Sequence, residues 1–397
     1  MSFGFCFFSL QSFAISTSTL PENIYSPTLR YGHIEGLDQR FTETGSLVKL
    51  TDYRSIEFDA KTLAKFNTQA QQLIATLNRF GAFGIGDSLN LGVLEIQTQP
   101  TIEYTAPVLA RGITSRWTVA LGVPVIHYQN NVKLSQSFSN INYYRNQFSG
   151  LSNELDQALN TNIGESTQQV LAAKGYRRLE NRNEKFLGDL QLVSLYKLYE
   201  DENLSVMHQA TLSLPTGPQY DPNDLLALNT FHKTSLENIF SLSKKIGSIW
   251  KVTPYTSFRY NLPEKIDARV PLNEDDVIPD QSSIENVEKQ EGLSLEGGLQ
   301  NSVDLTDSFQ VTLDYKLGVK AEDRYNGSRS SRYDLLPQNS KSRWQKASVD
   351  FVYSTVKSYM KKSAAIPFML SLSLFDTLAG QNVERRTGQE LSMTLFF

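Results

Sequence analysis

Three segments of the chain carry charged or amide side chains at even spacings. They are Asp189, Gln191 and Lys197 in the first segment, Lys251 and Arg259 in the second, and Asp314, Lys316 and Lys320 in the third. Even spacing places the members of each set on one face of an extended strand. Such faces could line a path for solutes, or their opposite charges could pair and fill the interior of a sheet. The residues alone leave both interpretations open.

Catalysis and metal binding have little support in the sequence. The chain has four histidines: His33, His127, His208 and His232. A serine nucleophile needs a histidine placed to activate it, and no pattern of that kind is present. No spacing of histidines or carboxylates resembles a metal site. We therefore expect no enzyme activity, no bound metal and no cofactor.

The composition excludes several classes of protein. The 397 residues include 38 basic and 42 acidic ones, and the net charge of −4 gives no reason to expect a nucleic-acid partner. No uncharged apolar run reaches the roughly 18 residues of a membrane helix, which excludes an α-helical membrane protein. Hydrophobic residues make up 40% and aromatic residues 11%, which argues against intrinsic disorder. Length alone would fit two or three soluble domains.

The strongest signal is an alternation of apolar and polar residues with a period of two. Residues 309–319 show it best, with six apolar side chains on one face: Phe309, Val311, Leu313, Tyr315, Leu317 and Val319. This stretch is longer than the usual strand of about five or six residues in a soluble protein. It matches the roughly nine to eleven residues of a tilted strand that crosses a bilayer.

The same alternation predicts eleven strands along the chain. They are expected at 95–109, 115–128, 186–199, 203–214, 232–245, 249–262, 291–302, 309–320, 343–355, 364–375 and 388–397. Single-chain bacterial barrels have even strand numbers, so one more strand is needed, and residues 47–58 are the candidate. The predicted fold is all-β, a transmembrane antiparallel up-and-down β-barrel of about twelve strands, with fourteen as the alternative. Charged side chains on these strands should face the lumen, since on the lipid face each would cost about 2–4 kcal/mol.

The connections between the strands alternate in length. Short turns are expected at 200–203, 246–248 and 303–308, and long polar loops at 130–185, 217–231, 263–290 and 321–342. Short periplasmic turns and long extracellular loops are typical of barrels in the outer membrane of Gram-negative bacteria. The third of these long loops is acidic, with nine acidic and three basic residues between positions 263 and 291.

The remaining segments complete the expected organisation. Residues 1–14 contain a short apolar run followed by small residues and are expected to be a signal peptide, with an N-terminal strand as the alternative. The missing basic region leaves open a true start upstream. Residues 15–45 are expected to form a periplasmic or lumenal segment and residues 46–397 the barrel. Spacings of three, four and seven predict helical insertions near 60–80 and 151–176.

A basic stretch lies at the expected outer end of one strand. Five basic and two acidic residues occur between positions 174 and 185. Arg177, Arg178 and Arg182 could form a rim that binds the phosphates of lipopolysaccharide. The alternative is an ordinary solvated loop.

Two sets of short motifs carry a resemblance to a known family. Residues 186–190 (FLGDL), Tyr196 with Lys197, and residues 214–218 (LPTGP) follow one another, and residues 111–117 lead to residues 123–125 (VPV) before them. The segment of about 95–262 resembles bacterial outer-membrane proteins of the phenol-degradation MetA-pathway family, distant relatives of the long-chain fatty-acid transporters. The resemblance implies a channel or transporter for small, often hydrophobic, organic compounds. The Asn-Pro-Ala plug motif of the fatty-acid transporters is absent, which argues against fatty acids as the solute.

The end of the chain carries a second resemblance. Leu391, Met393, Leu395 and Phe397 alternate with other residues up to the C-terminus. This pattern resembles the signal that the barrel assembly machinery of the outer membrane recognises, and it implies that machinery as a partner.

These features together predict an outer-membrane channel for the passive uptake of small organic solutes, hydrophobic ones included. Its expected partners are outer-membrane lipid and lipopolysaccharide, the barrel assembly machinery and the solute. A non-conducting barrel with a structural, adhesion or surface-interaction role is the alternative, and an outer-membrane enzyme comes third.

Overall fold

The computed structural model describes residues 18–50, 56–66, 68–81, 84–160, 163–228, 230–274, 276, 278–329 and 331–397. Two compact units form within it, and each is made of more than one stretch of the chain. The first contains Met1–Leu47, Pro100–Gln129 and Asn183–Phe397, and the second contains Val48–Gln99 and Asn130–Arg182. The expected signal peptide lies outside the described residues.

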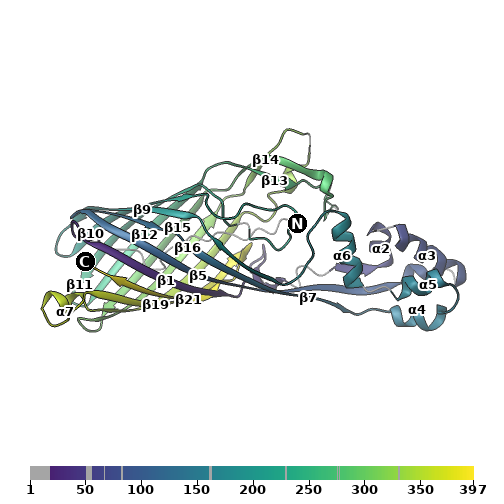
Figure 1. The fold of residues 1–397 in the computed structure, drawn as a ribbon, viewed down its shortest axis with the longest axis horizontal. Coiled ribbons are helices and arrows are strands. Elements are labelled where there is room, and N and C mark those ends of the chain that lie inside the picture. Colours follow the sequence, from purple (N-terminus) through teal and green to yellow (C-terminus); the bar gives the residue numbers. More distant parts are fainter. Residues whose placement is uncertain are drawn as a thin grey trace. The chain divides into compact units, whose positions relative to one another are not determined.

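Twelve antiparallel strands close into a barrel in the first unit (Figure 1). In order around the ring they are β1 (Tyr25–Glu35), β21 (Thr387–Leu395), β19 (Phe368–Gln381), β18 (Ser342–Ser354), β16 (Phe309–Lys320), β15 (Ser294–Asp304), β12 (Trp250–Asn261), β11 (Ser235–Ile246), β10 (Leu204–Leu214), β9 (Leu190–Glu200), β6 (Trp117–Gly122) and β5 (Asn90–Thr114). The part of β5 that begins at Pro100 belongs to this unit. This part of β5 pairs with β1 and closes the ring. The register partners run from Tyr25 opposite Arg111 to Ile34 opposite Ile102.

The predicted barrel and its twelve strands are confirmed, but the twelfth strand was assigned to the wrong segment. It is β1, which lies inside residues 15–45, so that stretch is not a separate periplasmic or lumenal segment. Residues 47–58 contribute β3 (Leu47–Lys49) and the start of β4 (Ile56–Asp59), and 51–55 lie outside the described residues. Alternation is hard to see in β1 because its outer face carries the polar residues His33 and Glu35 and a proline, Pro27, which is unusual within a strand.

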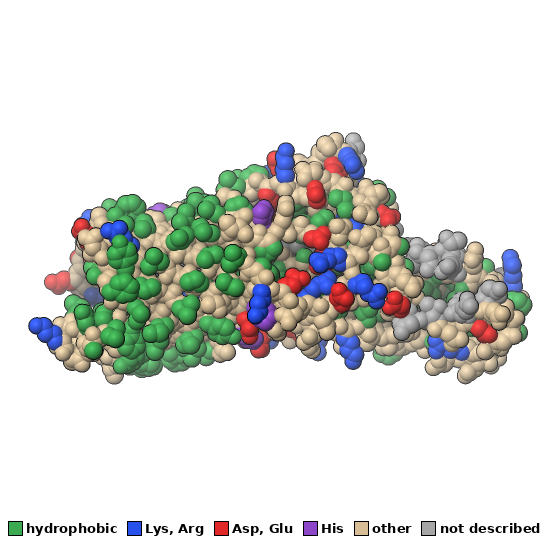
Figure 2. Space-filling view, in the orientation of Figure 1, with side chains coloured by type: hydrophobic (Ala, Val, Ile, Leu, Met, Phe, Trp, Pro, Cys, Tyr) green, Lys and Arg blue, Asp and Glu red, His purple; other side chains and the backbone are tan. Residues whose placement is uncertain are grey.

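Apolar side chains cover the outside of the barrel. Along β16 the exposed residues are Leu313, Tyr315, Leu317 and Val319, while Thr312, Asp314, Lys316 and Lys320 between them are buried. Figure 2 shows hydrophobic side chains gathered over the barrel wall, with acidic and basic side chains gathered beyond that band. The band is the surface that a transmembrane barrel presents to lipid.

None of the helices in the described part of the chain is long and apolar enough to cross a membrane.

The two ends of the barrel have connections of different length. At the end where β1 begins and β21 ends, the turns are short, and the longest, between β18 and β19, holds α7 (Val356–Met360). At the other end, long loops form two small sheets. One contains β13 (Glu264–Arg269), β14 (Ile284–Gln290) and β17 (Arg324–Asn326), and the other contains β2 (Gln39–Phe41), β3 and β20 (Val383–Glu384). The predicted segregation of short turns and long loops is therefore confirmed.

The second unit is helical and has its own hydrophobic core. Its helices are α2 (Ala60–Phe66), α3 (Thr68–Phe80), α4 (Ile141–Phe148), α5 (Asn153–Leu159) and α6 (Ile163–Ala173), joined by β4 and parts of β5 and β7 (Val125–Ser137); β8 (Arg182–Leu187) follows. Leu77, Leu94, Tyr144, Leu155 and Leu159 are buried together in this core. Helices occur where helical spacing was seen, but they belong to a compact unit and not to the barrel wall.

Four glycines on the lumen side of the barrel each lie directly opposite an aromatic residue of the neighbouring strand. The pairs are Gly32 with Tyr104, Gly298 with Tyr255, Gly318 with Trp344, and Gly388 with Phe375. A Cβ atom at any of these glycines would collide with the ring of its partner. The rings therefore lie across the glycines and cover the exposed backbone, a device that pins strand register.

Replacing Gly298 with alanine should destabilise the barrel by about 1–3 kcal/mol, the usual range for overpacking. The new Cβ would push the Tyr255 ring aside and break its hydrogen bond to Asp314, in which Tyr255 Oη lies 3.0 Å from Oδ1. The measurement is the temperature at which the unboiled protein loses its folded mobility in a gel. Gly297→Ala is the matched control, because the nearest atom to a Cβ at Gly297 is 4.0 Å away. Equal transition temperatures for the two variants would contradict the claim that the glycine–aromatic pairs stabilise the barrel.

Candidate functional site

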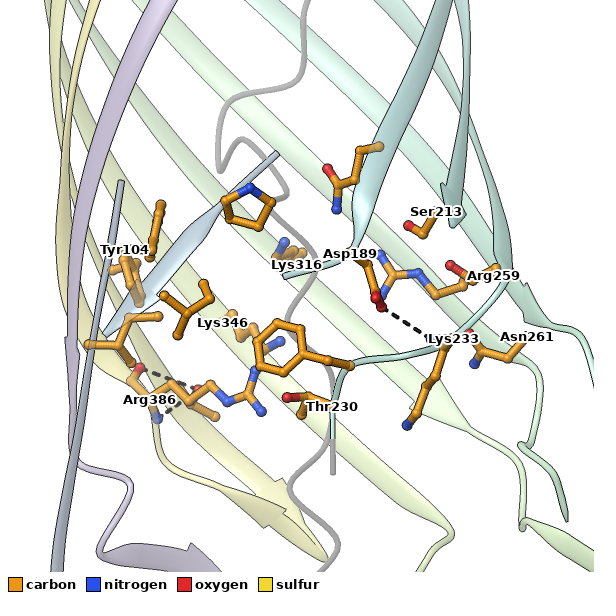
Figure 3. A pocket seen from close by; sticks show the side chains of 18 of the residues that line it. Tyr104, Asp189, Ser213, Thr230, Lys233, Arg259, Asn261, Lys316, Lys346 and Arg386 are labelled. Atoms are coloured by element: carbon orange, nitrogen blue, oxygen red, sulfur yellow. Dashed lines mark hydrogen bonds between the residues drawn. The ribbon is translucent and has the colours of Figure 1, made fainter. Parts of the chain in front are cut away.

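The barrel lumen contains a cavity of about 90 Å³ that all belongs to the first unit. This is well above the roughly 10–15 Å³ that a cavity needs to hold a single water. It is lined by Ile34, Tyr104, Pro124, Ile126, Asp189, Gln191, Ser213, Thr230, Phe231, Lys233, Ser235, Arg259, Asn261, Lys316, Lys346, Phe375, Asp376, Thr377 and Arg386. Figure 3 shows side chains from several strands and from the outer loops converging on this space.

Basic side chains form one part of the cavity wall. Arg259 Nη2 lies 2.8 Å from Glu237 Oε2, and Lys316 Nζ lies 3.6 Å from Glu296 Oε2. Arg386 Nη2 lies 3.7 Å from a carboxylate oxygen of Glu384 in β20. These acidic partners do not line the cavity themselves. The cavity therefore has a basic surface, and most of its counter-charge lies behind that surface.

Apolar side chains form another part of the wall. Ile34, Tyr104, Ile126, Phe231 and Phe375 line the cavity and belong to a buried apolar cluster in the first unit. The cluster continues through Leu37, Ile102 and Tyr128. One hydrophobic surface and one charged surface therefore meet in a single cavity.

Hydrogen-bonded ion pairs hold the strands together inside the lumen. Arg30 donates from Nη2 to Glu390 Oε2 at 2.7 Å, and Tyr104 also donates its hydroxyl to that carboxylate. Trp344 donates from Nε1 to Glu296 Oε1 at 3.0 Å. A buried charge is tolerated only when it is paired and hydrogen-bonded, so these contacts are needed for the polar interior to exist.

A single buried carboxylate, Glu291, binds two cavity-lining residues, Lys233 and Asn261, at the end with the long loops. Glu291, which is 5% exposed, accepts hydrogen bonds from Lys233, from Lys289 at 2.8 Å and from Asn261 at 3.0 Å. Burial alone would raise the pKa of the Glu291 carboxyl, but the ammonium groups of Lys233 and Lys289 hold that pKa well below its usual value. Burial lowers the pKa of the Lys233 ammonium. The negative charge of Glu291 raises that pKa, and the positive charge of Lys289 lowers it again.

Asp189 explains why the two recognised motifs occur together. Its Oδ1 accepts the backbone N–H groups of Gly217 at 2.8 Å and His232 at 3.0 Å, and its Oδ2 accepts that of Lys233 at 3.2 Å. Thr216 donates its hydroxyl to the carbonyl of Gly188 at 3.0 Å. The first motif (FLGDL) therefore anchors the loop that the second motif (LPTGP) begins.

The structure divides the eight lumen candidates into two groups. Asp189, Gln191, Arg259 and Lys316 line the cavity. Lys197, Lys251, Asp314 and Lys320 lie elsewhere: Lys197 pairs with Glu200 at 2.7 Å, Lys251 lies near the short-turn end of β12, Asp314 accepts from Tyr255, and Lys320 pairs with Asp323 at 2.6 Å. Charge pairing and cavity lining thus both occur, and Arg259 and Lys316 do both.

Sequence reasoning missed several residues of the cavity. Lys346 is on the polar face of a strand that the alternation predicts, so the signal for it was available. Lys233 and Arg386 lie in loops, where no alternation marks the side that faces the lumen. Tyr104 alternates with polar residues inside β5, but its aromatic ring suggests the lipid face.

The rim and assembly candidates are not among the residues that line the cavity. Arg177 and Arg178 are exposed, and Arg178 pairs with Glu165 at 3.2 Å. The Arg182 side chain is 8% exposed and lies 3.4 Å from Glu180. In the last strand, Leu391 and Met393 are exposed on the outer face, Leu395 is half-buried, and Phe397 pairs with Tyr25 at the start of β1.

Solved structures of outer-membrane proteins resemble this fold. An outer-membrane channel from Pseudomonas putida F1 matches with a TM-score of 0.54 and 13% identity, over 96% of this chain and 98% of that chain. The toluene transporter TodX from Pseudomonas putida matches with a TM-score of 0.31 and 8% identity, over 94% and 88% of the two chains. No protein-family model and no curated protein sequence matches the chain. At 13% identity the first similarity shows the fold alone.

The closed ring, the apolar outer band and the polar interior define the class of protein. The chain is a transmembrane antiparallel β-barrel of the bacterial outer membrane.

Replacing Glu291 with glutamine should loosen the loop end of the barrel. Two ammonium groups would then lie close together without a counter-charge, and removing one partner of a buried pair costs about 3–5 kcal/mol. Hydrogen exchange of residues 284–291, followed by mass spectrometry, should become faster at pH 7. Glu288→Gln, an exposed change on the same strand, is the control and should have no effect.

The same carboxylate sets a pH dependence for the natural chain. Because its pKa is lowered on folding, Glu291 stabilises the loops above the usual glutamate pKa of 4.5, and this stabilisation is lost only as the pH falls towards the lower folded value. Slow exchange of residues 284–291 should therefore persist from pH 7 down to about pH 4.5. Loss of protection between pH 7 and pH 5 would contradict this account.

Proposed function

We propose that the chain is an outer-membrane channel that lets small organic solutes, hydrophobic ones included, cross the membrane passively through the barrel lumen. The observation that carries the proposal is the cavity inside the barrel, whose walls are charged although the same strands present apolar residues to lipid. Buried ion pairs are seldom more stabilising than well-packed apolar groups. A barrel that only needed to be stable would therefore gain little from such an interior.

The similarity to the Pseudomonas putida F1 protein supports the proposal in its general form. That protein is an outer-membrane channel with the same fold. The similarity gives no information about the solute or about the direction and energetics of transport.

The outer loops favour a second candidate, a non-conducting barrel that acts by adhesion or surface interaction. The sheet of β13, β14 and β17 has its own small core of Ala268, Val270 and Val287. Residues 263–291 carry nine acidic and three basic residues, which could bind a basic surface. Conduction through the lumen separates this candidate from the channel.

Contacts of the histidines favour a channel over an enzyme. His33 and His127 contact carboxylate or amide groups, with His127 Nε2 2.7 Å from Asn183 Oδ1. His208 contacts Asn238, and His232 contacts the carbonyl of Gly217. Within the described part of the chain, these histidines form no hydrogen bond to a serine hydroxyl that could serve as a nucleophile.

Two further partners follow from surface features. We propose that Arg177 and Arg178 contribute to binding lipopolysaccharide phosphates, with Arg182 in a supporting position. Leu391, Met393, Leu395 and Phe397 are proposed to present the C-terminal strand to the barrel assembly machinery.

A pair of cysteine variants tests conduction through the lumen. Ser213 lines the cavity, whereas Thr256 is exposed on the outer face of β12. In a Cys6→Ser background, Ser213→Cys should lose most of its single-channel conductance in planar bilayers after reaction with a charged, water-soluble methanethiosulfonate. Thr256→Cys faces lipid and should be unaffected. Absence of stepwise conductance in the unmodified protein would favour the adhesion role, and equal responses of both variants would contradict a path past Ser213.

A further inference from the structure

Two lysines lie directly opposite each other on the lumen side of neighbouring strands. Lys316 in β16 and Lys346 in β18 are register partners in an antiparallel pair, and both line the cavity. Like charges in this position destabilise a sheet unless something compensates them. The arrangement therefore calls for negative charge close to both ammonium groups.

Glu296 supplies negative charge near both lysines, but within ion-pairing distance of only Lys316. Lys316 Nζ lies 3.6 Å from Glu296 Oε2. Lys346 Nζ lies 5.2 Å from the centre of the Trp344 ring, and no carboxylate of the described residues lies within ion-pairing distance of it. Glu296 also accepts a hydrogen bond from Trp344 Nε1 at 3.0 Å. The Glu296 carboxylate is thus already engaged, and the Lys346 ammonium faces the cavity.

The strand register next to Lys346 is irregular. Gln345 pairs with Ala379 and Lys346 with Thr377, so Leu378 in β19 has no register partner. Bulges of this kind redirect nearby side chains and often lie next to functional sites. Thr377 also lines the cavity.

An apolar surface lies beside the two lysines. Ile34 and Tyr104 come from β1 and β5, and Phe375 comes from β19, the neighbour of β18. Figure 3 shows Tyr104 on the side of the cavity opposite Arg259 and Lys233, with Lys316 and Lys346 between them. A molecule in this cavity could therefore contact the lysines and the hydrophobic surface at the same time.

We propose that the cavity binds a small amphipathic organic anion, with its carboxylate or sulfonate on Lys346 beside Lys316 and its apolar part against Tyr104 and Phe375. This inference rests on the proposed function, for which it names the class of solute. A single aromatic ring with one acidic group is the smallest molecule that offers both an apolar face and a negative charge to these lining residues.

Binding of benzoate tests the proposal without depending on transport. The purified full chain in detergent is titrated calorimetrically with benzoate, and with benzamide as a neutral molecule of the same shape. Benzoate should bind at least tenfold more tightly than benzamide. Lys346→Gln should weaken benzoate binding about tenfold or more, as expected for the loss of a charge-assisted hydrogen bond, and leave benzamide unchanged. Lys346→Arg, which keeps the charge, should restore most of the affinity.

The controls make each outcome decisive. Lys361→Gln removes an exposed lysine outside the barrel strands and should not change binding. Heat-dependent gel mobility shows whether Lys346→Gln is folded. If this variant does not fold, the affinities of the natural chain and of Lys346→Arg for benzoate and benzamide still test the anion site. Equal affinity for both probes, or an unchanged benzoate affinity in folded Lys346→Gln, would overturn the proposal. Displacement of benzoate by phosphate at equal concentration would overturn the claim that the site prefers an organic anion.

Conductance distinguishes this proposal from the proposed function. A barrel that conducts but shows no preference for benzoate refutes the anion site and leaves the channel intact. A barrel that binds benzoate as described but never conducts refutes the channel and leaves the site.

Discussion

The pairing of β1 with β5 is the constraint on which the rest of the barrel depends. Inside a bilayer no water satisfies an exposed backbone N–H or C=O group, so a sheet that crosses it must have no free edge. β1 lies near the start of the chain, yet it closes the ring between β5 and the last strand, β21. Closure fixes which end of each strand carries long loops and which face of each strand meets lipid. The polar lumen follows directly, because every second residue must then point inward.

A polar lumen in turn has to be neutralised and filled. Charges on neighbouring strands meet in pairs such as Arg30 with Glu390 and Arg259 with Glu237, so the ion pairs also bind strands to each other. The glycine–aromatic pairs solve a different problem. A ring that lies across the glycine of the next strand, as Tyr255 does at Gly298, covers the backbone of that strand. The same contact holds the two strands in register.

The sequence predicts the parts of this structure that depend on local alternation. Strand β16 and the inward direction of Asp314 and Lys316 follow from the period of two alone. The identity of β1 does not, because its outer face is broken by Pro27 and its role is set by pairing with strands far away in the chain. The cavity is likewise out of reach, since Lys233 and Arg386 enter it from loops and Lys346 differs from Lys316 only in having no carboxylate beside it. Whether a lysine has a carboxylate beside it depends on which strands become neighbours in the folded barrel.

The two surfaces of the cavity restrict the solute more than either does alone. A neutral hydrophobic molecule would contact Tyr104 and Phe375 but would displace water from Lys346 without replacing its hydrogen bonds, which costs free energy. An inorganic anion would compensate the lysine but leave the apolar surface in contact with water. Only a molecule with a charged end and an apolar body satisfies both surfaces at once. For the proposed anion, selectivity would depend on how the ring of twelve strands places Lys346 of β18 relative to Tyr104 of β5 and Phe375 of β19.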